Sequence, residues 1–284
     1  MIITNIKNKY PDIERLEVYN LGAMSHVKVS FEMPIYSGQV DGLGVLNLLE
    51  AIRSSGLEKI TRFYQASTSE LYGKVKEIPQ KETTPFHPRS PYGVAKLYGF
   101  WIVKNYRESY NMFACNGILF NHESCRRGPT FVTRKITRGL NMILTGERNK
   151  LVLGNIYSKR DWGHAKDYTE MQWKILQQSK PDDYVIATGK AISVREFVNE
   201  CCKYLKLKIK WVGSGINEKA YIIKGNKKEL IIKVDKKYYR PLEIDYLKGN
   251  PTKAFRKLKY KLKNTLQDLV KDMLDSDIKL AKNK

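Results

Sequence analysis

Two neighbouring stretches constrain this chain more than any other part of it. Residues 63–73, FYQASTSELYG, read as a buried strand that ends in polar residues. Residues 90–96, SPYGVAK, read as a helix start, because Ser90 can cap the helix and Pro91 suits its first position. A buried strand followed by a long helix is the repeating unit of α/β proteins with a parallel sheet.

Four polar side chains in these stretches predict a reactive pocket. Thr68 and Glu70 are two residues apart, so in an extended chain their side chains point to the same side. Tyr92 and Lys96 are four apart and share one helix face, where the ammonium would favour the phenolate of Tyr92. A Tyr-x-x-x-Lys pair alone is usually an ordinary surface pair, so the prediction depends on both pairs together.

Strands and helices alternate along the first half of the chain. We expect an amphipathic helix within 1–15, a strand at 16–23, mostly one long helix at 33–57 that ends at Gly56, and a strand at 62–67. A helix at 91–111 and a strand at 114–120 follow. This order predicts a doubly wound parallel sheet, which binds ligands outside the carboxyl ends of its strands. Thr68, Glu70, Asn121 and the pair Gly22-Ala23 fall at such ends.

The second half of the chain has a different composition and a different order of expected elements. Clustered arginines follow Glu123, a last apolar strand is expected at 184–188, and Ser193 with Glu196 forms a capping box. A polar stretch then runs to Asp235, and a basic helix ends the chain. We interpret this half as a smaller α+β domain.

Composition excludes several classes of protein. The chain has no apolar run long enough to span a membrane, no apolar leader-like segment, and four cysteines without a disulfide or zinc spacing. We therefore expect a cytoplasmic protein with reduced thiols and no metal. The net charge of +22 fits either a field that attracts polyanions or lysines on solvated faces. We favour solvated lysines and expect no nucleic-acid partner, because no nucleic-acid fold signature is present.

The wording of both opening stretches resembles the extended short-chain dehydrogenase/reductase family, and within it the GDP-mannose 4,6-dehydratases. The resemblance continues through NLGAMSHVKVSFE (20–32), NGILFNHES (116–124), KRDWGHAKDY (159–168), VIATGKAISVREFV (185–198) and VDKKYYRPLEIDYLKGNPTKA (234–254). It extends roughly from Leu16 to the C-terminus. It implies a truncated NADP-binding Rossmann-like domain at 1–121 and 161–190, and a substrate domain for the GDP-sugar at 122–160 and 191–284.

The resemblance also implies a reaction, the conversion of GDP-mannose to GDP-4-keto-6-deoxymannose by a lyase that uses NADP, the first step toward GDP-fucose. Tyr92 would take the proton of the sugar 4-hydroxyl while hydride leaves C4 for the nicotinamide, and Thr68 would orient that hydroxyl. Glu70 would remove the C5 proton and assist loss of the 6-hydroxyl as water, before hydride returns to C6. Lys96 would also bind the nicotinamide ribose.

Other positions match family contacts. The implied cofactor neighbours are Leu21, Ser25, Tyr92, Lys96, His122 and Arg127, and the implied GDP-sugar contacts are Asn121, Lys135, Arg160, Arg240 and Glu243. Without the resemblance, His122 would read as a turn histidine, and the arginines as solvated loop charges. Cys125 stands where the family usually has proline, so we expect a looser loop there.

One family feature is not found in this sequence. No Gly-x-x-Gly-x-x-Gly turn, the pyrophosphate cradle of a dinucleotide fold, precedes Leu16. We therefore expect a Rossmann-like sheet without its first βαβαβ portion, weak NADP binding and low turnover. The alternative to an active dehydratase is an inactive truncated homologue that binds GDP-sugar or a full-length partner. A homo-oligomer is left open.

Overall fold

The computed structural model describes residues 2–239 and 241–282, which form two compact units. Of these residues, the first unit comprises 2–120, 168–189 and 249–261, and the second comprises 121–167, 190–239, 241–248 and 262–282. Residues 161–167 thus pack in the second unit and 249–261 in the first, whereas the sequence placed these two segments the other way round.

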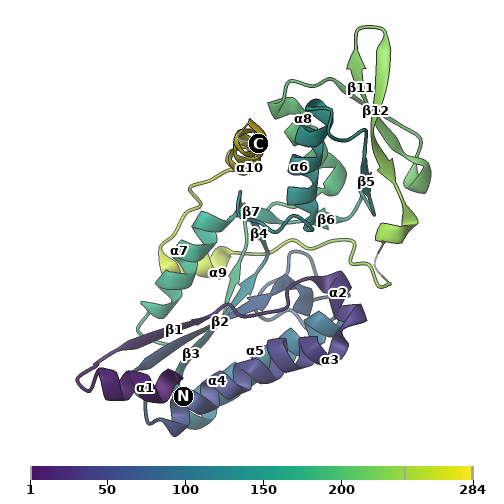
Figure 1. The fold of residues 1–284 in the computed structure, drawn as a ribbon. Coiled ribbons are helices and arrows are strands. Elements are labelled where there is room, and N and C mark those ends of the chain that lie inside the picture. The colour runs from purple at the N-terminus through teal and green to yellow at the C-terminus, as the bar shows by residue number, and fades with distance from the viewer. Residues whose placement is uncertain (1, 240, 283–284) are drawn as a thin grey trace. The chain divides into compact units, whose positions relative to one another are not determined.

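A four-stranded parallel sheet is the centre of the first unit (Figure 1). Its order is β1 (Leu16–Asn20), β2 (Thr61–Thr68), β3 (Phe113–Leu119) and β8 (Tyr184–Ile186), and every neighbouring pair is parallel. The predicted parallel sheet is confirmed, and its first strand lies at the edge next to β2.

Helices cover this sheet. Figure 1 shows α4 (Gly44–Ser54) and α5 (Pro91–Tyr110) on one face, with α7 (Ala165–Leu176) and α9 (Thr252–Leu258) on the other. The helix α1 (Ile2–Lys9) precedes the sheet, and α2 (Val27–Glu32) and α3 (Pro34–Ser37) follow β1. Fully buried side chains of α4, α5 and the strands, among them Leu49, Phe63 and Val103, form the core of this layer.

The ends of α5 follow the sequence signals. The Ser90 hydroxyl accepts a hydrogen bond from the Gly93 backbone N–H at 3.0 Å, and Pro91 takes the first turn. Asn111 ends the helix in the left-handed conformation, with φ of 54°. The expected helix at 91–111 is therefore confirmed almost to the residue.

The expected single helix at 33–57 is wrong in its interior. Between α3 and α4 the chain forms a π-helical turn, η1, over Gly38–Leu43. A π turn holds one residue more than an α turn, so it shifts the faces of the helices on either side. Gly56, with φ of 64°, follows the end of α4 as expected.

The second unit is an α+β arrangement. The helices α6 (Val132–Leu144), α8 (Val194–Tyr204) and α10 (Leu266–Lys282) share one apolar core with a sheet of order β10-β11-β12-β5. Two short pairs join β4 (Asn121–Glu123) to β7 (Trp162–His164), and β6 (Lys159–Arg160) to β9 (Ile192–Ser193). The capping box of Ser193 and Glu196 at α8 is confirmed.

The stretch before Asp235, expected to be merely polar, forms a sheet. It contains β10 (Ile209–Val212), β11 (Lys219–Lys224) and β12 (Lys227–Val234), with β5 (Leu151–Leu153) parallel to β12. The short turns η3 (Gly215–Asn217) and η4 (Lys236–Tyr238) flank these strands. In β11 the buried Ala220 and Ile222 alternate with the less buried Lys219, Tyr221 and Ile223, so the period of two was present but short.

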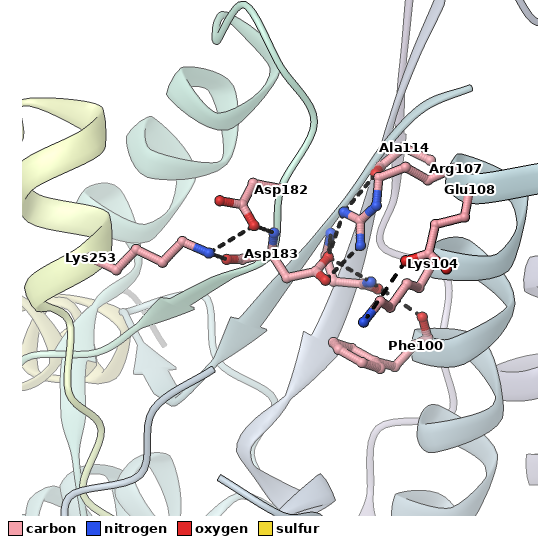
Figure 2. A network of polar contacts seen from close by, with 9 residues as sticks. Phe100, Lys104, Arg107, Glu108, Ala114, Asp182, Asp183 and Lys253 are labelled. Carbon is pink, nitrogen blue, oxygen red and sulfur yellow. Dashed lines mark hydrogen bonds and ion pairs between the residues drawn. The ribbon is translucent and has the colours of Figure 1, made fainter. Parts of the chain in front are cut away.

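A polar network fastens the loop before β8 to α5 in the first unit (Figure 2). The carboxylate of Asp183 accepts hydrogen bonds from both terminal nitrogens of Arg107, at 3.0 and 2.7 Å, and two from the backbone and side-chain N–H groups of Asn116. Lys253 on α9 donates to Asp182 at 2.7 Å and to the Asp183 carbonyl at 2.8 Å. This network joins α5, β3, β8 and α9.

No helix in the described part of the chain is long and apolar enough to cross a membrane. Within the same residues, no group of three or more histidine, cysteine or acidic side chains is arranged to hold a metal ion.

Candidate functional site

The site of the first unit starts where β2 ends. Thr68 is the last residue of the strand, and its hydroxyl accepts a hydrogen bond from the backbone N–H of Glu70 at 3.2 Å. This contact opens a 3-10 turn, η2 (Ser69–Leu71), so the extended geometry expected for Thr68 and Glu70 stops at Thr68. The turn buries both residues, which are 8% and 9% exposed. A hydroxyl and a carboxyl are thus held at the carboxyl edge of the sheet.

The first turn of α5 packs directly against this turn. A Cβ added to Gly93 would lie 3.1 Å from the Glu70 carbonyl oxygen and 3.3 Å from the Ser90 hydroxyl. A larger residue at 93 would push the helix away from Glu70. The glycine therefore brings the helix start, which includes Tyr92, against the strand end that holds Thr68.

Tyr92 and Lys96 occupy one buried face of α5. They are 7% and 3% exposed, and the Lys96 Nζ lies 5.9 Å from the centroid of the Tyr92 ring. The Lys96 ammonium donates a hydrogen bond to the carbonyl oxygen of Ala66 in β2 at 3.1 Å. Burial lowers the pKa of Lys96 to about 8, against the opposing pull of Asp41. The pKa of Lys96 therefore lies well below that of an ordinary lysine.

Asp41 is a residue of this site that the sequence analysis missed. It lies in η1 and is fully buried; its Oδ1 accepts a hydrogen bond from the Met24 backbone N–H at 2.7 Å. Burial raises the pKa of its carboxyl, while Lys96 and the Met24 bond lower it. The available signal was an aspartate inside an apolar helical pattern, between Gly38 and Gly42.

Two further residues with implied cofactor roles follow β1. Leu21 directly follows the strand and exposes 55% of its surface, and Ser25 is also exposed. Asn20, the last residue of β1, is buried and donates to the side chain of Gln65 at 2.8 Å. This contact joins the carboxyl ends of β1 and β2, so the loop with Leu21 and Ser25 starts at the same sheet edge as the site.

These residues fit one end of a nicotinamide dinucleotide. An ammonium has three N–H donors, and Lys96 gives one of them to Ala66, which leaves donors for ribose hydroxyls. The exposed Leu21 offers apolar surface beside the strand end. In residues 2–239 and 241–282, no strand-to-helix turn has the Gly-x-x-Gly-x-x-Gly spacing that cradles a pyrophosphate.

In the second unit, β4 contains Asn121 and His122, both half-buried and paired with Trp162 and Gly163 of β7. Arg127 does not point into open solvent. Its Nε lies 3.0 Å from the buried carboxylate of Glu123, and its guanidinium stacks 3.5 Å from the centroid of the Phe131 ring. Arg127 is therefore a pre-oriented cation and not a free loop charge.

The described residues for which the family resemblance implies the other GDP-sugar contacts are also in the second unit. Lys135, on α6, places its Nζ 3.9 Å above the Tyr238 ring, and Arg160, in β6, is 7% exposed and donates to the Lys159 carbonyl at 2.9 Å. Glu243 is half-buried. Arg240 lies outside the described residues.

The backbone at Cys125 makes a hydrogen bond that a proline at this position could not make. Its backbone N–H donates a hydrogen bond to the Asp272 carboxylate on α10 at 3.1 Å. Proline has no N–H, so a family-like proline would lose this bond. The looser loop expected here is offset by the contact with α10.

Taken together, the first unit assembles the residues of acid–base chemistry: a hydroxyl, a carboxyl, a phenol and a buried ammonium. Comparison with known proteins bears on what such a site acts on. The sequence pattern of the GDP-mannose 4,6 dehydratase family matches residues 4–273. The chain is 59% identical over 280 residues to the GDP-mannose 4,6 dehydratase of Dictyostelium discoideum, covering 99% of this chain and 78% of that protein.

Similar relatives occur in distant organisms. The GDP-mannose 4,6-dehydratase of Vibrio cholerae is 54% identical over 286 residues, and the human enzyme is 54% identical over 271, with 77% and 72% of those proteins covered and 98% and 95% of this chain.

Solved structures share the fold. RMD from Pseudomonas aeruginosa, complexed with NADPH, matches with a TM-score of 0.77 at 21% identity, over 93% of this chain and 81% of that one. The dTDP-glucose 4,6-dehydratase of Bacillus anthracis, in complex with NAD, gives 0.75 at 19%, over 99% and 79%. At such identities the likeness establishes the Rossmann-like fold, whereas the curated relatives and the family pattern establish kinship. The chain therefore belongs to the GDP-mannose 4,6-dehydratase family.

Proposed function

We propose that this protein is a GDP-mannose 4,6-dehydratase, a lyase that converts GDP-mannose to GDP-4-keto-6-deoxymannose. The observation that carries the proposal is the grouping of Thr68, Glu70, Tyr92 and Lys96 at one sheet edge, in a chain 54–59% identical to proteins named for this activity. Each residue has the chemistry that the reaction needs at a buried position.

The roles follow from the residue types. Tyr92 is the base that takes the proton of the sugar 4-hydroxyl, and Thr68 hydrogen-bonds this hydroxyl and orients it. Glu70 removes the C5 proton, which the new 4-ketone has made acidic, and returns a proton to the departing 6-hydroxyl. The buried ammonium of Lys96, on the same helix face as Tyr92, favours the phenolate.

A nicotinamide cofactor completes the site, and we propose NADP. When bound, this cofactor would supply the acceptor for the C4 hydride and the donor of hydride to C6. Tyr92 would give the proton that it took from the 4-hydroxyl to C5, which restores the base. Lys96 and Tyr92 would hold its nicotinamide ribose, with Leu21 and Ser25 beside it. His122 and Arg127, in the second unit, are proposed as further neighbours; the ion pair with Glu123 and the stacking on Phe131 already orient Arg127.

The second unit is proposed to recognise the GDP-sugar through Asn121, Lys135, Arg160, Arg240 and Glu243. Support comes from Arg160, which is nearly buried and whose planar guanidinium can grip diphosphate oxygens in pairs. We expect GDP to bind more tightly than UDP. Arg160→Ala should weaken GDP binding by about 1.5–3 kcal/mol, the scale of hydrogen bonds to charged groups. Calorimetry that shows no loss in this variant would contradict the assignment.

We also propose that the protein forms a homo-oligomer. What supports this is a stripe of exposed apolar side chains on α5, at Val94, Tyr98 and Trp101, which are 56%, 42% and 51% exposed. Residues at this spacing lie on one helix face. Sedimentation velocity should show a species larger than a monomer, and Trp101→Glu should shift it to the monomer. A monomeric wild-type protein would refute the proposed homo-oligomer.

Turnover by the purified chain tests the main proposal. GDP-mannose and NADP should yield a product lighter by one water, detected by mass spectrometry. Tyr92→Phe and Glu70→Gln should each lower kcat by about 10²–10⁴-fold, the usual range for a general acid or base. Tyr110→Phe, an exposed position at the other end of the same helix, is the matched control. Binding of GDP-sugar without any turnover would favour the alternative, a non-catalytic homologue.

A further inference from the structure

The π turn η1 buries a carboxylate that the reaction as described does not use. Asp41 is fully buried, and its Oδ2 has no hydrogen-bond partner among the described residues. An unsatisfied buried carboxylate oxygen is costly unless a nearby positive charge compensates it. Lys96, itself 3% exposed, is the cation that interacts with it.

Close packing of two helices brings these charges together. A Cβ added to Gly42 would lie 3.4 Å from the Ala95 carbonyl oxygen, and one added to Gly99 would lie 3.2 Å from the Asp41 carbonyl oxygen. Two glycines therefore allow the backbones of η1 and α5 to approach each other next to both charged residues. The π turn supplies the extra residue that directs Asp41 inward.

We propose that Asp41 is a positioning residue of the dehydratase, whose buried carboxylate is the counter-ion that keeps Lys96 protonated beside Tyr92. The inference rests on the proposed function, because Lys96 matters to the reaction through Tyr92. Asp41 itself does not contact substrate: it acts on Lys96, and Lys96 acts on Tyr92.

The other groups around Lys96 do not replace Asp41. Glu70 belongs to η2, and Tyr92 belongs to the same helix as Lys96. The group of β2 that contacts the Lys96 ammonium is the Ala66 carbonyl, which carries no charge. Glu50 on α4 is bound to Arg53 and to Tyr106.

Two further neighbouring elements carry titratable groups. Cys115 on β3 stays neutral, because burial raises the pKa of its thiol to about 12. The helix α2, which also packs on α5, carries Lys28 and Glu32, a cation and an anion. Of the groups on all these elements, Asp41 is the one that raises the pKa of Lys96, against the larger opposing effect of burial.

With Asp41 charged, Lys96 stays an ammonium up to a pKa of about 8. Asp41→Asn keeps an oxygen that can accept the Met24 N–H bond but removes the charge, so Lys96 should lose its proton at lower pH. A neutral Lys96 no longer favours the phenolate of Tyr92, and activity should require higher pH.

The first test does not depend on activity. In the cofactor-free protein, NMR of isotope-labelled lysine follows the titration of Lys96 in wild type, Asp41→Asn and the control Glu50→Gln, which removes a carboxylate from α4. We expect the Lys96 midpoint to fall by about one pH unit or more in Asp41→Asn, the scale of losing one close opposite charge, and to stay in place in Glu50→Gln. An unchanged midpoint in Asp41→Asn would overturn the inference and leave the proposed function intact.

The second test uses turnover and stability. The acid limb of the kcat/KM profile should move to higher pH in Asp41→Asn, whereas a merely structural role would lower the rate at every pH without moving the limb. If the Asp41→Asn protein does not fold, the pairing is tested by making the same substitution in the Lys96→Met variant. There Asp41 is a lone buried charge, so adding Asp41→Asn should raise Tm, while a fall in Tm would refute the pairing.

Discussion

Removing the carboxylate of Asp183 should strongly destabilise the first unit. This side chain accepts four hydrogen bonds, two from Arg107 and two from Asn116, at 2.7–3.0 Å (Figure 2). In Asp183→Ala, Arg107 keeps its bond to the Ala114 carbonyl at 3.1 Å but loses its counter-ion. The charge of Arg107 is then left largely buried without an anion.

The magnitude follows from burial. Breaking a buried ion pair on one side costs about 3–5 kcal/mol. Both side chains here are 13% exposed, so some water reaches the pair and the lower end applies, about 3 kcal/mol. For a unit of this size, that loss corresponds to a fall in Tm of roughly 6–12 °C.

Urea unfolding followed by tryptophan fluorescence measures the effect, since Trp101 and Trp173 lie in the first unit. The control is Lys104→Ala on the same helix, whose contact with Glu108 spans 3.9 Å between side chains 37% and 64% exposed. The control should change the free energy of unfolding by less than about 0.5 kcal/mol. A loss below about 1 kcal/mol in Asp183→Ala, with an unchanged denaturant slope, would refute the reasoning.

Three further predictions concern single buried groups. Gly117→Ala should cost about 1–3 kcal/mol in unfolding experiments, because its Cβ would overlap the Tyr64 hydroxyl and lie 2.7 Å from the ring Cζ; a neutral result would contradict this packing. Tyr64→Phe should be neutral or stabilising in the same assay, since that buried hydroxyl has no hydrogen-bond partner among the described residues, and a loss above about 1 kcal/mol would disprove this. Burial raises the pKa of the Glu123 carboxyl more than Arg127 lowers it. The folded wild type therefore binds the carboxyl proton more tightly than the unfolded chain does, and the protein loses stability as pH rises above 4.5. Urea midpoints of Glu123→Gln relative to wild type should therefore rise with pH, and a constant difference would show the sign to be wrong.

Local patterns in the sequence determined most of the first unit. The buried strand at 62–67, the helix capped by Ser90 and the alternation of elements predicted the parallel sheet. These signals are local, because helix caps and apolar periodicity depend on residues a few positions apart. The pairing of Tyr92 with Lys96 on one helix face was predictable for the same reason.

Only the tertiary structure decided which distant groups meet. The π turn at Gly38–Leu43 interrupts a helix that periodicity predicts as continuous, and it buries Asp41 beside Lys96 through the close approach at Gly42 and Gly99. The hydroxyl of Thr68 converts an expected strand end into the turn that holds Glu70. Such contacts depend on how closely two backbones pack and on which buried charge compensates which. That information lies between segments far apart in the chain and in no local pattern.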